Sequence, residues 1–233
     1  AERCDLHVSP AESLRLRELL PEAEGMVIRT YTTVNQDMVE AAPKLKVVGR
    51  AGAGIDNIDL ASCKANNIRV VHTPDANSEA VVEFVLATMP AQLRPVEQVV
   101  GAMDVAQWSK LRDSAMCSSQ FNETTIGIVG FGRIGGRLGR IARSMGFRVL
   151  FHDIEDIEQT HGCESSNLDT LLGDSQAVSI HVDGRKENKH LCDATFFSKM
   201  KAGAVFINTS RGVVVDSQAL ANHVSLEDRK SVV

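Results

Sequence analysis

Short apolar runs alternate with stretches of helical periodicity along most of this chain. The runs are rich in β-branched residues, which is typical of buried strands in a parallel sheet. We predict strands at 25–28, 46–48, 69–72, 125–129, 148–152, 177–181 and 204–208. Helical spacing of apolar residues predicts helices at 10–20, 35–42, 58–66, 79–89, 96–108, 133–145, 168–172, 194–200 and 217–223. Strands separated by helices of about ten residues predict an α/β fold with parallel sheets.

The strand and helix pattern forms two blocks that are joined by helices. Pro90 and Pro95 are expected to break or kink the helical structure between the blocks. We therefore predict a first domain at 1–88 and a second at 89–233, with bridging helices within 79–108.

Composition and charge exclude several classes of partner. Hydrophobic residues make up 43% and charged residues 24% of the 233, which is ordinary for a globular protein. The net charge of −5 argues against nucleic-acid binding, which needs a basic face. No apolar run is long enough for a membrane helix, and no secretory signal is visible at the abrupt N-terminus, so we expect a cytoplasmic protein. The five cysteines are scattered without metal-ligand spacing, which predicts reduced thiols and no metal site.

The most specific chemical signal is a glycine-rich turn after the predicted strand at 125–129. Gly130, Gly132 and Gly135 follow the pattern Gly-x-Gly-x-x-Gly and lead into the predicted helix at 133–145. The first glycine allows the tight turn, the second has no side chain to obstruct a pyrophosphate, and the third lets the helix pack close to the strand. The pattern predicts a dinucleotide site.

Two further features favour NAD as the dinucleotide. The helix N-terminus, with Arg133 and Ile134 as candidate contacts, offers N–H groups and a positive dipole end to the phosphates. Asp153 follows the next strand, 23 residues beyond Gly130, where a carboxylate accepts hydrogen bonds from ribose hydroxyls and repels a 2′-phosphate. The alternative is a strand–helix turn with a structural role alone.

Three segments taken together resemble the D-isomer-specific 2-hydroxyacid dehydrogenases. They lie at 46–60 with 72–79, at 126–136 and at 200–216, and the resemblance extends over residues 20–224. It implies two doubly wound parallel-sheet domains, a flavodoxin-like substrate domain and a Rossmann NAD domain, with the active cleft between them. It also implies an enzyme that transfers a hydride from a D-2-hydroxy acid to NAD and gives the 2-oxo acid. The phosphoglycerate-oxidising members match best, which makes 3-phosphoglycerate the first candidate substrate.

The resemblance assigns Arg211 the role of the family's catalytic arginine. A guanidinium can hold a carboxylate with paired hydrogen bonds and polarise the neighbouring carbonyl. Thr209, Ser210, His181 and Asp216 are implied as cofactor contacts, and His181 is not the family's catalytic histidine. The alternatives are a surface arginine in a turn for Arg211, a structural role for His181 and a helix N-cap for Asp216.

The resemblance also gives the first domain the substrate contacts. Ala51 and Gly52 are small residues that expose backbone N–H groups able to hold an anion. Arg29 and Arg50 resemble arginines that face a substrate phosphate, and two cations suit a phosphate dianion. Asn77 resembles a residue near the substrate and nicotinamide. A solvated charge is the alternative for Arg29, and a helix N-cap is the alternative for Asn77.

The sequence departs from the family pattern in two places. The glutamate and histidine that work with the family's arginine would lie beyond Val233, and no histidine in the chain stands in a matching context. We favour the interpretation that the sequence covers part of an intact enzyme; a deliberate fragment and a natural NAD-binding protein without turnover are the alternatives. The second departure is at 182–185, Val-Asp-Gly-Arg, where the family has a proline after its His-Val pair.

Two alternatives to phosphoglycerate oxidation remain open. One is a regulatory protein, of the dehydrogenase-like corepressor type, that senses NAD without turnover. The other is an enzyme for a different hydroxy acid, such as glycerate or lactate. In each case the resemblance implies a homodimer with its contact in the 79–108 helices, and we expect Trp108 to be buried in packing.

Overall fold

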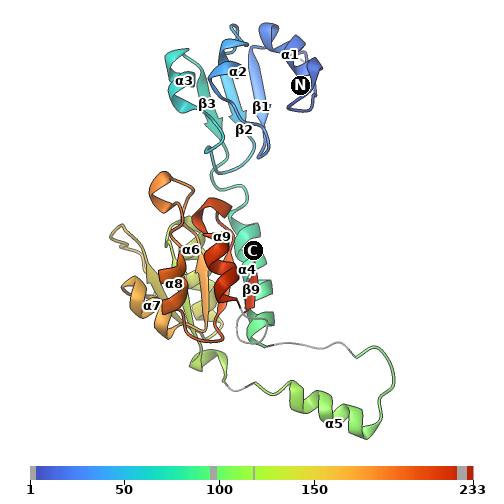
Figure 1. The fold of residues 1–233 in the computed structure, drawn as a ribbon, viewed down its shortest axis with the longest axis vertical. Coiled ribbons are helices and arrows are strands. Elements are labelled where there is room, and N and C mark those ends of the chain that lie inside the picture. The colour runs from blue at the N-terminus through green and yellow to red at the C-terminus, as the bar shows by residue number, and fades with distance from the viewer. Residues whose placement is uncertain (1–3, 95–98, 118, 225–229, 233) are drawn as a thin grey trace. The chain divides into compact units, whose positions relative to one another are not determined.

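A computed structural model describes residues 4–94, 99–117, 119–224 and 230–232 (Figure 1). The chain divides into two compact units, Ala1–Asn77 and Ser78–Val233. Helix α4 (Ser78–Leu93), which we expected to bridge two domains, therefore lies wholly within the second unit.

The first unit is a parallel sheet of three strands in the order β1-β2-β3, with helices between them. Its elements are α1 (Leu14–Leu19), the 3₁₀ turn η1 (Leu20–Glu22), β1 (Gly25–Ile28), α2 (Gln36–Glu40), β2 (Val47–Arg50), α3 (Leu60–Ala65) and β3 (Arg69–His72). These confirm the predicted strands and helices of this region, with helices a few residues shorter than expected.

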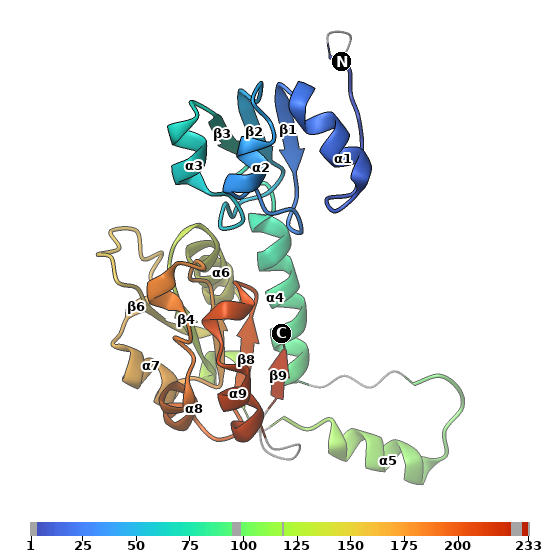
Figure 2. The ribbon, with the colours of Figure 1, turned by 45° about the horizontal axis from the view of Figure 1, so that its top comes forward.

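Side-chain caps fix where the helices of the first unit begin. The oxygens of Ser13, Asn35 and Asp59 each accept a hydrogen bond from the backbone N–H three residues further on. In Figure 2 helices α2 and α3 lie in front of the strands, and this face holds the buried core. On the other face Val27 and Val71 are 80% and 37% exposed.

The second unit is a parallel sheet of six strands in the order β6-β5-β4-β7-β8-β9. The strands are β4 (Thr125–Val129), β5 (Arg148–His152), β6 (Glu164–Ser165), β7 (Ala177–Ile180), β8 (Val205–Asn208) and β9 (Lys230–Val232). The chain adds β5 and β6 on one side of β4, then returns to add β7 and the later strands on the other. The strand order thus reverses between β4 and β7, and ligands bind at such a switch point in open α/β sheets.

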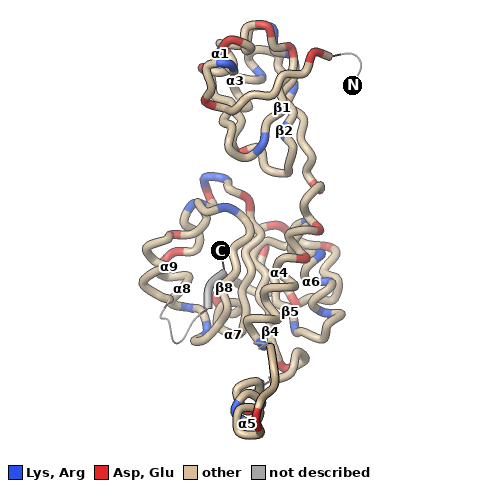
Figure 3. Tube along the Cα trace, turned by 90° about the vertical axis from the view of Figure 1, so that its right-hand side faces the viewer, with Lys and Arg blue, Asp and Glu red and all other residues tan. Residues whose placement is uncertain are grey.

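Helices cover both faces of the six-stranded sheet, as Figure 3 shows with α8 and α9 on one side and α4 and α6 on the other. Besides α4, the helices that cover the sheet are α6 (Arg133–Ser144), α7 (Leu168–Asp174), α8 (Ala194–Lys199) and α9 (Ser217–His223). The unit also contains the 3₁₀ turns η2 (Phe121–Glu123), η3 (Lys186–Asn188) and η4 (Gly212–Val214). Val85, Ile128 and Leu138 belong to the core on one side of the sheet, while Leu171 and Phe206 belong to the core on the other side. The α/β class and the doubly wound second domain are confirmed.

Between α4 and β4, the positions of the helix ends differ from those that the apolar pattern predicted, and side-chain capping explains the start of α5. Pro90 does not end α4, which continues to Leu93. The helix expected at 96–108 is instead α5 (Val105–Ser114), because Asp104 and Gln107 form a capping box that fixes its start. Pro95 lies outside the described residues. Trp108 is 53% exposed, so the expectation that it is buried is wrong.

Among the described residues, none of the helices has the length and apolar character needed to cross a membrane.

Candidate functional site

The glycine turn between β4 and α6 has a geometry that only glycines allow at two positions. Gly130 has a φ of +89°, and a Cβ placed on it would lie 2.8 Å from the carbonyl carbon of His181. A Cβ on Gly135 would lie 2.1 Å from the carbonyl oxygen of Gly130. Both positions therefore need glycine for close backbone approach.

Gly132 differs from its two neighbours because the space around it is open. No described heavy atom lies within 4 Å of a Cβ placed there. Gly132 is also the N-cap of α6, and no side chain caps this helix end. An open cradle in front of backbone N–H groups and a positive dipole end fits the pyrophosphate of a dinucleotide.

Asp153 lies beside the same turn. Its Oδ2 accepts a hydrogen bond of 2.5 Å from the backbone N–H of Phe131, and its Oδ1 accepts one of 3.0 Å from the N–H of Glu155. The carboxylate therefore points at the turn rather than into the core, and it stays a candidate for the ribose hydroxyls.

His181 follows β7 and connects it to its two neighbours. Its backbone N–H donates to the carbonyl of Val129, at the end of β4, over 2.8 Å. In the ring, Nε2 lies 2.9 Å from the hydroxyl of Ser179, and Nδ1 lies 3.5 Å from the hydroxyl of Thr209. Burial lowers the pKa of His181 to about 4, so the ring is neutral near physiological pH. The structural alternative for His181 is thus supported.

Arg211 sits on a loop that Asn208 holds in place after β8. The buried Asn208 accepts hydrogen bonds at Oδ1 from the N–H and hydroxyl of Ser210, over 3.0 and 2.7 Å. Its Nδ2 donates to the carbonyl of Arg211 over 3.2 Å. Nη1 of Arg211 donates to the carbonyl of Ser210 over 3.0 Å, and the side chain is only partly exposed. Our sequence analysis did not single out Asn208, although a polar residue at the end of a buried strand was a signal.

The sheet topology brings these residues to one edge. Gly130, His181 and Thr209 follow the parallel neighbours β4, β7 and β8, whose carboxyl ends share that edge. Asp216 lies further along, where its Oδ1 accepts from the N–H groups of Gln218 and Ala219. The N-cap alternative for Asp216 is confirmed, and its cofactor contact stays a prediction.

The substrate candidates of the first unit gather at the ends of β1 and β2. Arg50 folds back on its own loop, where Nη1 donates to the carbonyl of Ala51 over 2.9 Å and Nη2 to the hydroxyl of Thr30 over 3.4 Å. Gly52 has a φ of +149°, and a Cβ there would overlap this guanidinium. Arg29 is exposed.

Asn77 is exposed and directly precedes α4. Arg133 is exposed and Ile134 partly buried in the first turn of α6. Within the described residues, no group of three or more His, Cys, Asp or Glu side chains is arranged to hold a metal ion.

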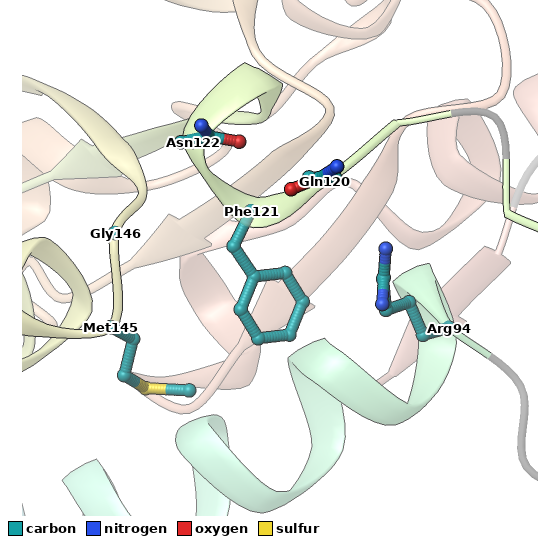
Figure 4. Close-up of a pocket in the computed structure, with 6 residues that line it drawn as sticks. All are labelled: Arg94, Gln120, Phe121, Asn122, Met145 and Gly146. Carbon is teal, nitrogen blue, oxygen red and sulfur yellow. The ribbon is translucent and has the colours of Figure 1, made fainter.

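A separate cavity of about 510 Å³ opens at the other end of the second unit's sheet. Figure 4 shows the Phe121 ring between Met145 and Arg94, on segments that precede β4 and β5 or end α4. The Arg94 guanidinium lies 5.2 Å from the centre of this ring, and its Nη2 donates to the carbonyl of Ser119 over 3.0 Å. Because this cavity is at the amino ends of the strands, it is not part of the glycine-turn site.

Sequence comparison assigns both halves of the chain. Residues 86–230 match the sequence model described as "D-isomer specific 2-hydroxyacid dehydrogenase, NAD binding domain", and residues 2–112 match the one described as "D-isomer specific 2-hydroxyacid dehydrogenase, catalytic domain". The matched NAD-binding region includes the glycine turn, Asp153, His181 and Arg211.

Individual relatives agree with these matches. The chain is 32% identical to a hydroxypyruvate reductase of Thermotoga maritima over 91% of its own length and 69% of that protein. It is 34% identical to a D-3-phosphoglycerate dehydrogenase of Haemophilus influenzae, over 97% of this chain and 54% of that one. The structure of D-lactate dehydrogenase from Aquifex aeolicus, complexed with NAD and lactic acid, superposes with a TM-score of 0.75 at 29% identity, over 88% of this chain and 62% of that chain. The chain thus spans only about half to two thirds of several relatives.

The neutral state of His181 predicts a pH-dependent stability. Its pKa is lowered from 6.5 to about 4 in the folded protein, so the unfolded chain binds this proton first as the pH falls. The contribution is absent above about pH 6.5 and destabilises the fold progressively down to about pH 4, by roughly 2 kcal/mol at about pH 5. Urea unfolding at about pH 7 and about pH 5 measures it, and His181→Gln should remove this part of the pH dependence.

His190→Asn is the matched control, because His190 is exposed and has a φ of +55°, which asparagine tolerates. This control should retain the full loss of stability at low pH. Equal pH dependence in the wild type and His181→Gln would contradict the assignment of a neutral ring.

Proposed function

The chain belongs to the D-isomer specific 2-hydroxyacid dehydrogenases, and we propose that it acts in NAD-dependent hydride transfer between a D-2-hydroxy acid and the 2-oxo acid. One observation carries the proposal: the open cradle at Gly132 lies at the same sheet edge as the loop that bears Arg211. The site of a dinucleotide and a cation for a carboxylate thus follow β4 and β8, which are separated only by β7.

NAD is the cofactor of this family's nucleotide-binding domain, and the glycine turn fits it. Gly130 and Gly135 shape the turn, Gly132 leaves room for the pyrophosphate, and the N-terminus of α6 supplies positive dipole character. Asp153 would accept the ribose hydroxyls and disfavour a 2′-phosphate. When bound, the nicotinamide accepts the hydride in oxidation and returns it in reduction.

Arg211 is the residue we assign to the substrate carboxylate. A guanidinium offers paired donors to a carboxylate and stays charged at every physiological pH. Asn208 holds the loop, and the carbonyl of Ser210 holds one η nitrogen of Arg211. Both contacts limit the number of side-chain conformations from which substrate binding has to select. His181 is unsuited to exchange the hydroxyl proton, because its pKa of about 4 keeps the ring neutral and its hydrogen bonds tie it to the sheet.

We assign the first unit to the far end of the substrate and favour 3-phosphoglycerate. Arg50 and Arg29 are two cations near the ends of β1 and β2. The N–H groups of Ala51 and Gly52, which the sequence suggested for an anion, instead donate to the carbonyls of Ile28 and Arg50 over 2.9 Å each. A phosphate dianion makes better use of two cations than the unsubstituted side chain of lactate does. The relatives compared above have the names of enzymes, which favours turnover over the regulatory alternative.

We also propose that the complete protein is a homodimer, with α5 and the residues before it in the contact. Val100, Val105 and Trp108 are 93%, 82% and 53% exposed. Exposed apolar side chains that cluster along one short segment are typical of an interface.

A side chain at position 132 tests the cofactor site separately from the fold. Gly132→Val should lower the unfolding midpoint only slightly, because the space there is open and the cost is that of a poorer N-cap, and it should weaken NAD binding by at least about tenfold in calorimetric titration. Gly135→Ala is the comparison, and it should lower stability as well, because its Cβ would meet the carbonyl oxygen of Gly130. Unchanged NAD affinity in Gly132→Val would contradict the assigned site.

Turnover by the complete protein tests the role of Arg211. Arg211→Gln should lower kcat/KM by roughly 100-fold for every hydroxy acid that the wild type oxidises, because the charged donor to the carboxylate is lost. NAD reduction with D-3-phosphoglycerate, glycerate and D-lactate measures this. NAD binding without turnover of any hydroxy acid by the wild type would instead support the regulatory alternative.

Arg29→Ala in the same assay identifies the substrate class. It should raise KM for phosphoglycerate alone, while Arg15→Ala, which removes an exposed arginine of α1, should change no kinetic constant. Unchanged phosphoglycerate kinetics in Arg29→Ala would favour a hydroxy acid without phosphate.

The dimer proposal predicts the sedimentation behaviour of the complete protein. The wild type should sediment as a dimer, and Val105→Glu should shift it toward monomer, because a buried charge without a partner is costly at an interface. Val8→Glu is the control, since Val8 is 80% exposed in the first unit. A monomeric wild type would rule the dimer out.

A further inference from the structure

The loops that follow β7 and β8 run together beyond the sheet. The N–H of His190 donates to the carbonyl of Val213, and the N–H of Cys192 donates to the carbonyl of Val214, each over 3.0 Å. The N–H of Asp216 then donates to the carbonyl of Cys192 over 3.1 Å. The chain that follows Arg211 is thereby attached to the loop after β7, while the chain before it continues from β8.

Gly184, in the loop after β7, lies directly against the side chain of Arg211. A Cβ placed on Gly184 would be 3.0 Å from Cγ of Arg211 and 3.6 Å from its Cβ. Gly184 is not among the glycines with positive φ, so its backbone does not require glycine. A side chain at position 184 would require the near end of the Arg211 side chain to shift by a few tenths of an ångström, and this end cannot move without turning the whole side chain.

The residues beside Gly184 hold its backbone in place. Both oxygens of the Asp183 carboxylate accept from Arg185, at Nε and Nη2, over 2.7 Å each. Nδ2 of Asn188 donates to Oδ1 of Asp183 over 2.9 Å and to its carbonyl over 3.0 Å. The hydrogen bonds from Arg185 are the main reason why the pKa of Asp183 is lowered. These three side chains, which we call the Asp183 clasp, present Gly184 at a defined place.

We propose that Gly184 and the Asp183 clasp are positioning elements for Arg211, and that they set the direction in which its guanidinium meets the substrate carboxylate. The proposal rests on the function assigned to Arg211 above. A shift of a few tenths of an ångström at Cγ grows along the side chain before it reaches the guanidinium.

The test observes the arginine directly, without substrate. The Nε–Hε cross-peak of Arg211, assigned by its absence in Arg211→Gln, reports the environment of the guanidinium by NMR. Gly184→Ala should shift this cross-peak and lower kcat/KM by roughly tenfold or more, with NAD affinity unchanged. Gly173→Ala is the control, because its Cβ would make only an ordinary contact of 4.0 Å with the carbonyl of Lys199.

Asp183→Ala is the second variant, and it adds no atoms near Arg211. It should shift or broaden the same cross-peak by releasing the clasp, so the proposal is tested even if Gly184→Ala does not fold. An unchanged cross-peak in folded Gly184→Ala or in Asp183→Ala would overturn the positioning role. If the wild type turned over no hydroxy acid while the cross-peak moved as expected, the proposed function would fail and the positioning of Arg211 would stand.

Discussion

The second unit depends on one close approach, between the carbonyl of Gly130 and the first turn of α6. A Cβ at position 135 would lie 2.1 Å from that oxygen, so only glycine lets the helix begin directly after β4. This contact brings the N-terminus of α6 to the point where the strand order reverses. The backbone around Gly130 also contacts the start of the loop after β7, through His181. The glycine turn and the loop after β7 thus depend on a shared arrangement of backbone.

Two polar side chains at this sheet edge, His181 and Asn208, carry no charge. His181 is kept uncharged by burial and placed between the hydroxyls of Ser179 and Thr209. Asn208 serves the backbone of its loop with neutral hydrogen bonds. A carboxylate bound by Arg211, as proposed, would therefore meet no competing cation from His181. The close-packed backbone positions the charged Arg211, and the hydrogen bonds of the uncharged Asn208 hold its loop in place.

Local signals and packing disagreed in the segment between α4 and β4. The apolar spacing at 96–108 predicted a helix with a buried Trp108, yet the helix begins after Asp104 and leaves Trp108 exposed. A capping box provides hydrogen-bond partners for the backbone N–H groups at the start of a helix. The spacing of apolar residues does not indicate where such a start lies. Pro90 was expected to break or kink the helix, but α4 continues through it to Leu93, and Val85 and Met89 on this helix are fully buried. Tertiary packing outweighed the cost of one missing backbone donor.

The sequence by itself determined the parallel α/β fold, the glycine turn, the acidic residue after β5 and the place of Arg211 after β8. These follow from short-range rules, because strand periodicity, turn glycines and strand-end residues are read within a few positions. Only the tertiary structure decided that His181 joins three strands and stays neutral, and that Gly184 lies against Arg211. Each of these depends on groups that the sheet brings together from separate crossovers, such as Ser179 with Thr209. Burial and close approach are properties of that assembly, and no spacing along the chain specifies them.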